Sequence, residues 1–324
     1  MRSFVVTDLS HVGEVRREAI CLAKNSAFNE LGIGKVALIA TELATNLVKH
    51  ATSGQLFMRV LECEEGMSLE FLSLDRGPGM ANVAKCMEDG HSTAGSLGTG
   101  LGAIVRTVDE FDIYSQPDKG TVAVARIASR PSSCIGVIHQ AKQGEPICGD
   151  AWLVQEWDGR SLCVVADGLG HGPIAAKAAI AIVGSMPQRL STATTLSLIE
   201  VAHQAAKSTC GASLGVAIVD HNSHEVRFAG VGNISAVVLD GNGSKHLVSY
   251  DGVIGDQYRK VKEDIHPWSR GSVLVMHSDG LGTRWDLKQY PGLLTKDPSL
   301  IAGVLYRDFA RTYDDTTVVV KRWM

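Results

Sequence analysis

The chain lacks the basic surplus of proteins that hold nucleic acid mainly by charge. It has 31 Lys and Arg against 35 Asp and Glu, which gives a formal net charge of -4 at pH 7. Both signs are spread along the sequence. Because binding to a phosphate backbone needs an excess of cations, we expect no nucleic-acid partner.

Paired cysteines are also missing. The seven cysteines are an odd number, are scattered along the chain, and form no Cys-x-x-Cys pair. This pattern is typical neither of a disulfide framework nor of a thiolate zinc site. Cys163 lies inside an apolar run, so we expect a small core residue there rather than a nucleophile.

The sequence has little that indicates a membrane. We find no apolar run approaching the roughly 20 residues that span a bilayer. The first residues lack the apolar region of a signal peptide. We therefore expect a cytoplasmic protein with no membrane partner.

What is present is an ordinary globular composition. The 324 residues are 45% hydrophobic and 20% charged, and by length they predict about two domains. The only linker-like stretch is Ala128–Ser133, which holds one proline and three serines. We predict a first domain over residues 1–128, a linker over 129–134 and a second domain over 135–324.

Three polar motifs stand out in the first domain. Glu42 and Asn46 are four residues apart on a predicted helix, so they project from one face. Asp75 ends a predicted strand and is followed by a glycine turn. The glycine-rich run Gly95–Gly102 leads into a helix, whose free N–H groups suit phosphates. Its spacing is neither that of a P-loop nor that of a dinucleotide fingerprint.

In order and spacing these motifs resemble the GHKL (Bergerat) ATP-binding fold of histidine kinases, gyrase and Hsp90. Within that superfamily the chain resembles the RsbT-type anti-sigma and stressosome serine kinases. The resemblance runs through Thr41–Asn46, Asp75–Gly79, Ser92–Gly102 and Asp109–Ile113. It covers nearly all of residues 1–128 and implies an ATP-binding α/β sandwich.

The resemblance also implies roles for single residues. Glu42 would be the general base on an acceptor serine hydroxyl, and Asn46 would hold Mg²⁺ (magnesium) that bridges the ATP phosphates. Asp75 would accept a hydrogen bond from the adenine amino group. The remaining nucleotide contacts would come from Gly77 and Gly79 beside the base, Gly98, Gly100 and Gly102 around the phosphates, and Thr121 behind the adenine pocket. The alternatives are a solvated helix face for Glu42 and Asn46, and a plain turn carboxylate for Asp75.

The second domain has a carboxylate at the end of its most apolar strand pattern. Cys163–Ala166 leads into Asp167, and glycines at 168, 170 and 172 then open an alanine-rich helix. Such a backbone suits a divalent cation and the close approach of a phosphate. Other acidic turns in the same half are Gly149–Asp150, Ser278–Gly280 and Asp314–Thr317. Brought together, their oxygens would make a pocket for two hard cations.

These motifs, with Gly230–Ile234, resemble the PPM-type metal-dependent serine/threonine phosphatases, in their bacterial SpoIIE and RsbX branch. Runs of strands, then helices, then strands independently favour a β-sandwich covered by helices. The predicted fold class is therefore α+β with two domains: an N-terminal GHKL α/β sandwich and a C-terminal PPM-type αββα sandwich.

By that resemblance Asp167 would bridge two Mn²⁺ (manganese) or Mg²⁺ ions, with the Gly168 carbonyl on one of them. Asp279 and Asp314 would complete one ion, and Asp150 would bind near the second or a weaker third. Water would attack the phosphoserine phosphorus in line without a covalent phosphoenzyme. Asp315 is the alternative to Asp314, which we prefer because it fills the first place of the family's pattern.

Two details of this half stay open. His171 is either a proton donor to the leaving serine oxygen or a surface loop histidine. No phosphate-binding arginine is evident near the start of the domain, where Lys142 is the only nearby cation.

These patterns lead to one main hypothesis. We expect a bifunctional serine kinase and phosphoserine phosphatase that uses ATP, Mg²⁺ and Mn²⁺. The family resemblances imply that its partners would be STAS-domain regulators, of the anti-anti-sigma or stressosome type, in a bacterial partner-switching pathway. The alternatives are a phosphatase gated by an ATP-sensing or partner-binding N-terminal module, and a sequestering protein with both sites vestigial. The sequence leaves the oligomeric state open.

Overall fold

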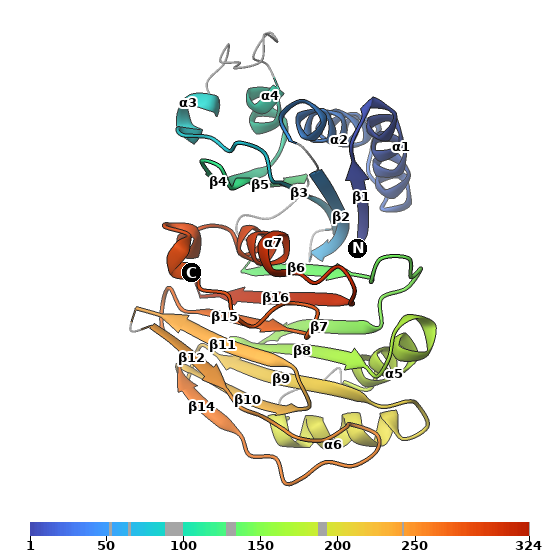
Figure 1. Cartoon of the computed structure of the whole chain (residues 1–324), viewed down its shortest axis with the longest axis vertical. Helices are drawn as coiled ribbons and strands as arrows, with labels where there is room; N and C mark the ends of the chain where they lie inside the picture. Colours follow the sequence, from blue (N-terminus) through green and yellow to red (C-terminus); the bar gives the residue numbers. More distant parts are fainter. Residues whose placement is uncertain are drawn as a thin grey trace. The chain divides into compact units, whose positions relative to one another are not determined.

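A computed structural model describes residues 1–51, 54–63, 66–87, 100–127, 134–186, 193–241 and 243–323. The chain forms two compact units (Figure 1). Unit 1 holds Met1–Ser133 and Tyr290–Arg307, and unit 2 holds Cys134–Gln289 and Asp308–Met324. The sequence predicted an uninterrupted second domain, so the grouping of Tyr290–Arg307 with unit 1 is an arrangement that it did not indicate.

Unit 1 is built on one antiparallel sheet with the strand order β1-β2-β3-β5-β4. The strands are β1 (Arg2–Val6), β2 (Gly54–Cys63), β3 (Gly66–Asp75), β4 (Glu110–Gln116) and β5 (Gly120–Ile127). The helices are α1 (Leu9–Asn25), α2 (Glu30–His50), α3 (Val83–Met87), α4 (Gly100–Thr107) and, from late in the chain, α7 (Pro298–Phe309), which follows the 3-10 turn η2 (Leu293–Thr295).

Helices α1 and α2 pack on one face of this sheet. Each begins at a side-chain cap: Asp8 accepts a hydrogen bond from the Ser10 N–H at 2.8 Å, and Asn29 from the Gly32 N–H at 2.8 Å. The core beneath them joins the apolar stripe of α2 to alternate residues of the strands. Its members include Val36, Ile39, Leu43 and Leu47 of α2 and Leu56, Phe71 and Ala125 of the sheet.

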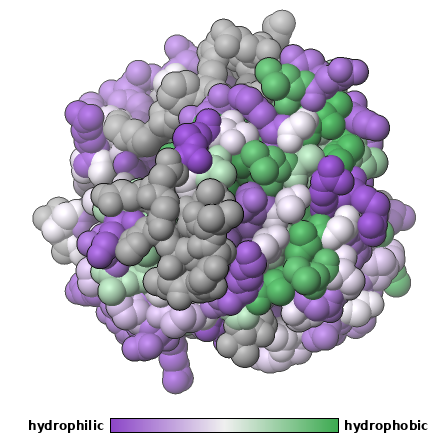
Figure 2. Space-filling model, turned by 90° about the horizontal axis from the view of Figure 1, so that it is seen from above, coloured by the Kyte–Doolittle hydropathy of each residue, from purple (hydrophilic) through white to green (hydrophobic). Residues whose placement is uncertain are grey.

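By length and composition alone, α2 is also long and apolar enough to cross a membrane. This departs from our expectation of no such segment. Core helices of soluble proteins meet the same criteria, and α2 lies on the sheet with its apolar stripe in the core. On its other side Leu31 and Leu38 are exposed. Figure 2 shows a face on which hydrophobic patches alternate with hydrophilic side chains, an ordinary arrangement for a protein surface.

The opposite face of the sheet of unit 1 contacts α7. Leu72, Leu74 and Val122 alternate with the residues that face α1 and α2, so they point the other way. A Cβ atom at Gly303 of α7 would lie 2.8 Å from a Val122 methyl carbon and 3.0 Å from one of Leu74. A side chain at position 303 would therefore push the helix off the sheet.

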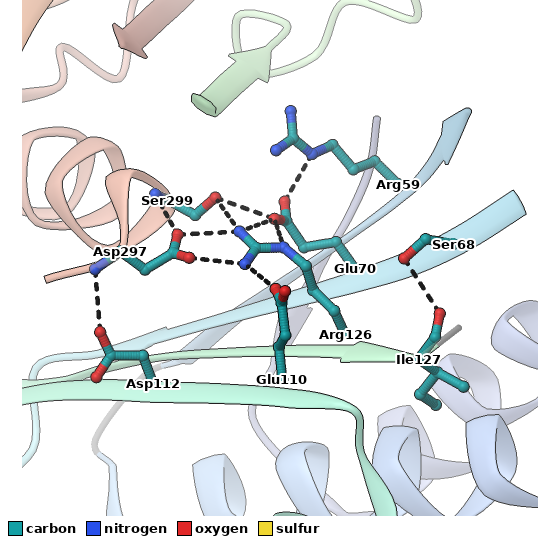
Figure 3. Close-up of polar contacts among 9 residues, drawn as sticks. All are labelled: Arg59, Ser68, Glu70, Glu110, Asp112, Arg126, Ile127, Asp297 and Ser299. Carbon is teal, nitrogen blue, oxygen red and sulfur yellow. Dashed lines mark hydrogen bonds and ion pairs between the residues drawn. The ribbon is translucent and has the colours of Figure 1, made fainter. Parts of the chain in front are cut away.

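A buried charge cluster also joins α7 to the sheet (Figure 3). Arg126 of β5 lies between Glu70 of β3 and Asp297, the residue before α7. Its guanidinium donates two hydrogen bonds to the Asp297 carboxylate, at 2.6 and 2.9 Å, and one to Glu70 at 2.7 Å. Arg59 donates to the other Glu70 oxygen at 2.6 Å, and Ser299 donates to Glu70 at 3.0 Å. Each acid of the cluster therefore has a cation beside it.

Unit 2 is a sandwich of two sheets. One has the order β13-β10-β9-β8-β7 with β14 on β10, and the other has the order β12-β11-β15-β16-β6. The strands are β6 (Ile135–Gln140), β7 (Asp150–Trp157), β8 (Arg160–Gly168), β9 (Ala212–Asp220), β10 (Glu225–Val231), β11 (Ser235–Asp240), β12 (Gly243–Leu247), β13 (Ser249–Tyr250), β14 (Asp264–Pro267), β15 (Val273–His277) and β16 (Thr316–Arg322); the 3-10 turn η1 (Leu287–Gln289) follows β15.

Helices α5 (Gly172–Gly184) and α6 (Thr195–Ala206) cover the first of these sheets. Apolar residues of both sheets, such as Phe228 and Met276, fill the space between them. Cys163 is fully buried in this core, which confirms its expected role. The predicted class of two α+β domains is confirmed, and most of α7 groups with unit 1.

Candidate active sites

The sandwich of unit 2 brings acidic residues from four segments to one end. Asp150 starts β7 and Asp167 lies near the end of β8, where the two are direct partners in the antiparallel register. Asp279 follows β15, and Asp314 and Asp315 precede β16, the strand paired with β15. Five residues separated by up to 165 positions in the chain thus lie at the ends of four strands.

Hydrogen bonds tie these strand ends together. The Ser278 hydroxyl donates to the Asp150 carboxylate at 2.7 Å and accepts from the Thr317 N–H at 2.9 Å. One buried hydroxyl therefore joins the ends of β7, β15 and β16. The Asn233 amide donates to Asp279 at 2.8 Å, and the Lys142 N–H donates to Asp315 at 2.8 Å.

Sequence reasoning did not single out Ser278 or Asn233 for this role. Each stands beside or inside a quoted motif, and that was the only signal for it. Their contacts join segments far apart in the chain, which local patterns do not reveal.

The carboxylates raise one another's pKa values. Burial raises the pKa of Asp167, and the charges of Asp150, Asp279, Asp314 and Asp315 add to the effect. Burial and the charges of Asp315 and Asp279 also raise the pKa of Asp150, against hydrogen bonds that lower it. For Asp279 the causes are burial and then the charge of Asp314. Like charges raise one another's pKa in this way when they are neighbours, which agrees with the pairing of Asp150 with Asp167 and the hydrogen bond from Ser278 to Asp150.

Two oxygens of the cluster have no partner within the described part of the chain. They are Oδ1 of Asp150 and Oδ2 of Asp315, on side chains that are each 3% exposed. Buried polar atoms are normally hydrogen-bonded, so this pair needs an explanation. Clustered carboxylate oxygens with free lone pairs are the ligands that hard divalent cations prefer. The residues present therefore fit Mg²⁺ or Mn²⁺.

The cluster is not a closed ligand cage. Among the described residues no group of three or more His, Cys, Asp or Glu side chains has the arrangement of a complete metal site. Mg²⁺ usually keeps several waters and takes only one or two carboxylates, so an open arrangement suits it. The ligand roles predicted for Asp150, Asp167, Gly168, Asp279 and Asp314 stay predictions.

Two glycines beside this cluster are closely packed against neighbouring atoms. A Cβ atom at Gly149 would lie 2.7 Å from Oδ2 of Asp315, and one at Gly168 would lie 2.1 Å from the Ala175 carbonyl oxygen. The first turn of α5 therefore lies against the end of β8. A side chain at either glycine would push the first turn of α5 away from these strand ends.

Asp314 and Asp315 both belong to the cluster. The charge of Asp314 raises the pKa of Asp167 and Asp279, whereas that of Asp315 raises the pKa of Asp150 and Asp167. Asp315 is the more buried of the two. The preference for Asp314 as the ligand stays a prediction.

The nearby histidines differ in their surroundings. Burial lowers the pKa of His277 to about 4, so its ring is neutral. Its Nδ1 donates to the Ser278 carbonyl at 2.8 Å, and its Nε2 accepts from the Trp285 indole at 3.2 Å. Both ring nitrogens are therefore occupied. His171 is exposed and pairs with Glu145 at 2.6 Å.

In unit 1 the structure brings Asp75 and Thr121 together. Asp75 Oδ1 accepts hydrogen bonds from the Gly77 N–H at 2.7 Å and from the Thr121 N–H at 3.1 Å. The Thr121 hydroxyl lies 2.9 Å from that of Ser115. Burial raises the pKa of Asp75 above its usual value. This carboxylate is therefore fixed by backbone donors at the end of β3.

The glycines after Asp75 are required by the fold itself. Gly79 has a φ of 68°, and a Cβ atom there would lie 1.9 Å from the Gln116 carbonyl oxygen. A Cβ atom at Gly77 would lie 2.4 Å from the His50 carbonyl oxygen. Close backbone packing thus accounts for both, besides the predicted contact with a base.

The predicted phosphate side of the nucleotide site is described only in part. Glu42 and Asn46 lie half-buried on α2, which packs against α4. Gly100 begins α4 and Gly102 is buried within it. Gly98 lies outside the described residues. The predicted roles of these residues stay predictions.

The end of α7 reaches the turn that holds Asp75. The Arg307 guanidinium donates to the Asp75 carbonyl at 3.4 Å, and the Arg76 guanidinium donates to the Arg307 carbonyl. The charge of Arg307 also lowers the pKa of Asp75, against the larger effect of burial. A segment from the C-terminal half of the sequence therefore contacts the candidate nucleotide site.

Two protein families match the chain, one for each part. The histidine kinase-like ATPase domain matches residues 5–127, and stage II sporulation protein E (SpoIIE) matches residues 157–323. Both resemblances predicted from the sequence are confirmed.

Two relatives from Bacillus subtilis (strain 168) agree with this division. The serine/threonine-protein kinase RsbT is 34% identical over 100 residues, which are 31% of this chain and 75% of RsbT. The phosphoserine phosphatase RsbX is 28% identical over 141 residues, 43% of this chain and 70% of RsbX. A solved structure from work on the bacterial stressosome is 27% identical with a TM-score of 0.54, and the match covers 58% of this chain and 98% of that one.

Proposed function

Because the chain belongs to the SpoIIE family through residues 157–323 and carries a histidine kinase-like ATPase domain over residues 5–127, we propose that it is a bifunctional enzyme. Unit 2 would be a metal-dependent phosphoserine phosphatase, and unit 1 an ATP-dependent protein serine kinase. Their common substrate class would be STAS-domain regulators of a partner-switching pathway, in the cytoplasm. RsbX and RsbT are a phosphatase and a kinase by name, which supports this pairing.

One observation carries the phosphatase proposal: the cluster of Asp150, Asp167, Asp279, Asp314 and Asp315, with two buried oxygens that lack partners in the described chain. Asp167, Asp279 and Asp314 would hold the cations, with Asp150 and the Gly168 carbonyl. When bound, Mn²⁺ or Mg²⁺ would neutralise this cluster, activate water and stabilise the charge of the transferring phosphoryl group.

The surrounding residues would orient the acids. Ser278 holds Asp150 while bound to the N–H of Thr317, and Asn233 holds Asp279 from the side open to solvent. The neutral ring of His277 carries no free lone pair for proton transfer, because both nitrogens are bonded. We therefore assign it to positioning Ser278.

The kinase proposal rests on Glu42, Asn46, Asp75 and Thr121. Phosphoryl transfer needs positioning and charge neutralisation more than covalent help. Asn46 would hold Mg²⁺, Glu42 would accept the proton of the serine hydroxyl, and Asp75 would bind adenine beside Thr121. The start of α4 would supply N–H groups to the phosphates.

The phosphatase test uses the phosphoserine form of a STAS-domain protein and Mn²⁺. Phosphate release by the wild type and its loss in Asp167→Asn support the proposal. Asp251→Asn, an exposed acid in another turn, is the matched control. A wild type that releases no phosphate with either metal would overturn the proposal.

The kinase test follows transfer of the ATP γ-phosphate to the unphosphorylated STAS-domain protein. Glu42→Gln should abolish transfer, because glutamine has a similar shape but cannot accept the proton. Glu14→Gln, an exposed acid on α1, should leave transfer intact. Absence of transfer by the wild type would remove the kinase proposal.

A second candidate function is regulation, in which ATP in unit 1 gates the phosphatase. The observation that favours it is the contact of Arg307 with the turn of Asp75. In chain order α7 lies between Asp279 and Asp314, so a shift of α7 would pull on both. Under this view a non-hydrolysable ATP analogue changes the phosphatase rate, and Asn46→Ala abolishes the response. If the phosphatase rate is the same with and without the analogue, ATP does not gate the phosphatase.

A further inference from the structure

The carboxylate cluster presents a problem for an anionic substrate. A phosphate monoester is a dianion near neutral pH, and five acids line its proposed site. Two divalent cations would not fully neutralise five carboxylates. Binding therefore calls for a further positive group close to the acids.

The segment before Asp314 carries such a group. It runs alongside the residues after Asp279: the Gly282 N–H donates to the Phe309 carbonyl at 2.9 Å, and the Arg311 N–H donates to the Gly280 carbonyl at 2.7 Å. The Asp314 N–H in turn lies 3.4 Å from the Arg311 carbonyl oxygen. The backbone of Arg311 is therefore fixed between two acids of the cluster.

These backbone contacts place Arg311 beside Gly280, the residue after Asp279, and three residues before Asp314. The positive charge of Arg311 also opposes the rise in the pKa of Asp279. Within the described chain it forms no ion pair or side-chain hydrogen bond, and the residue is half-buried. Arg126 differs, because acids occupy its donors. Arg311 thus keeps its donors for a ligand.

Other basic residues in the neighbouring segments are less suitable. His171 is paired with Glu145. Lys142 contacts Asp315 through its backbone N–H, and its ammonium is a point charge. A guanidinium offers a planar fork that matches two phosphate oxygens at once.

We propose that Arg311 binds the phosphate group in the carboxylate site, donating to two non-bridging oxygens of the phosphoserine and of the inorganic phosphate released from it. This inference rests on the proposed phosphatase function. It assigns the positive group that sequence reasoning sought near residue 142 to a position 169 residues further along the chain.

The experiment uses the full chain with Mn²⁺ and three variants. Arg311→Met removes the charge and donors at similar length, and Arg311→Lys keeps the charge without the fork. Arg270→Met is the control, an exposed arginine in the turn before β15, at the other end of that strand from Asp279.

We expect Arg311→Met to raise the KM for the phosphoprotein and the inhibition constant of inorganic phosphate by roughly 10- to 100-fold, the effect of losing a charge-assisted bidentate contact. Arg311→Lys should recover part of both, and Arg270→Met should change neither. Calorimetric Mn²⁺ affinity should not fall in any variant, since Arg311 repels cations.

The outcomes separate this inference from the proposed function. An active wild type whose KM and phosphate inhibition are unchanged in Arg311→Met overturns the role of Arg311 alone. A loss of Mn²⁺ affinity in Arg311→Met also overturns it, because Arg311 would then hold the carboxylates in position rather than bind phosphate.

If the wild type hydrolyses no phosphoprotein, the proposed function fails first. Titration of inorganic phosphate into the Mn²⁺-loaded protein then decides the inference by itself. Weaker phosphate binding by Arg311→Met than by Arg270→Met supports it, and equal binding or no binding by the wild type overturns it.

Discussion

The two units each bury a cluster of charged side chains, and the clusters differ in composition. In unit 1, Glu70 and Asp297 are matched by Arg59 and Arg126, and the carboxylate oxygens of Glu70 both accept hydrogen bonds. In unit 2 the clustered groups all carry the same charge, and two oxygens lack partners in the described chain. The first cluster is complete without a ligand, whereas the second calls for cations.

The pKa values express this difference. Burial by itself raises the pKa of Glu70, but the charges of Arg59 and Arg126 outweigh it and lower the pKa to about 2. Burial acts in the same direction on Asp167, where neighbouring acids add to it. The neighbours, rather than the burial, therefore distinguish a structural charge cluster from a binding site.

The largest effect should come from Asp167→Asn. It removes the charge that all other acids of the cluster act on, so we expect phosphatase activity to fall by roughly 10³-fold. Initial rates at saturating Mn²⁺ measure it. A variant that keeps most of the wild-type rate would show that the unmatched cluster is no active site.

Arg126→Met should destabilise unit 1 strongly. It leaves Glu70 and Asp297 short of their shared cation in a buried position, at a cost of about 3–5 kcal/mol. Urea unfolding measures the change. Arg2→Met, which breaks a partly exposed pair with Glu18, is the control and should cost less than about 1 kcal/mol. Equal effects would mean that the buried cluster contributes no more than a surface pair.

Acid should weaken unit 1 through Glu70. Its pKa is near 2 in the folded protein against a usual value of 4.5, so the folded state holds the proton less tightly than the unfolded chain. The stabilisation is full above pH 4.5 and is lost as pH falls towards 2, by about 3 kcal/mol in all. Unfolding curves between pH 5 and 3 measure the slope. Glu70→Gln, which cannot ionise, should flatten it; an unchanged slope would contradict the assignment.

The smallest effect should come from Asp315→Asn, and its sign should depend on metal. With a chelator present, removing one of the like charges should stabilise unit 2 by about 1 kcal/mol, while the amide oxygen still accepts from the Lys142 N–H. With Mn²⁺ present the wild type should be the more stable, because bound ligand stabilises the folded state. Thermal unfolding in both conditions measures it. If Asp315→Asn is no more stable than the wild type in either condition, the acids of the cluster do not destabilise the fold by mutual repulsion.

Much of the fold was predictable because its signals are local. The apolar stripe of α2, the turn after Asp75 and the strand before Asp167 each depend on neighbours in sequence. The family resemblances, which depend on the order of these motifs, matched the first half to a kinase family and the second half to a phosphatase family. Convergence of the acids was predicted as a condition of the metal-site hypothesis, because no local pattern shows which strand ends meet.

What could not be predicted depends on contacts through space. Ser278, Asn233 and Arg311 acquire their roles from residues on other strands or loops. The affiliation of α7 was also hidden, since a helix with apolar residues on every side fits any core. The signal available in the sequence was the apolar run from Leu300 to Leu305, which the structure buries.

The path of the chain through α7 bears on how this protein can be divided. Cleavage within residues 128–133 would leave Tyr290–Arg307 on one fragment and the sheet that it covers on the other. The amino-terminal fragment would expose Leu72, Leu74 and Val122 together with the charge cluster around Arg126. The other fragment would carry the apolar helix α7 without the sheet against which it packs. Two separately expressed halves should therefore be poorly soluble alone and recover when mixed, whereas a hybrid that keeps residues 290–307 attached to the amino-terminal part would stay in solution.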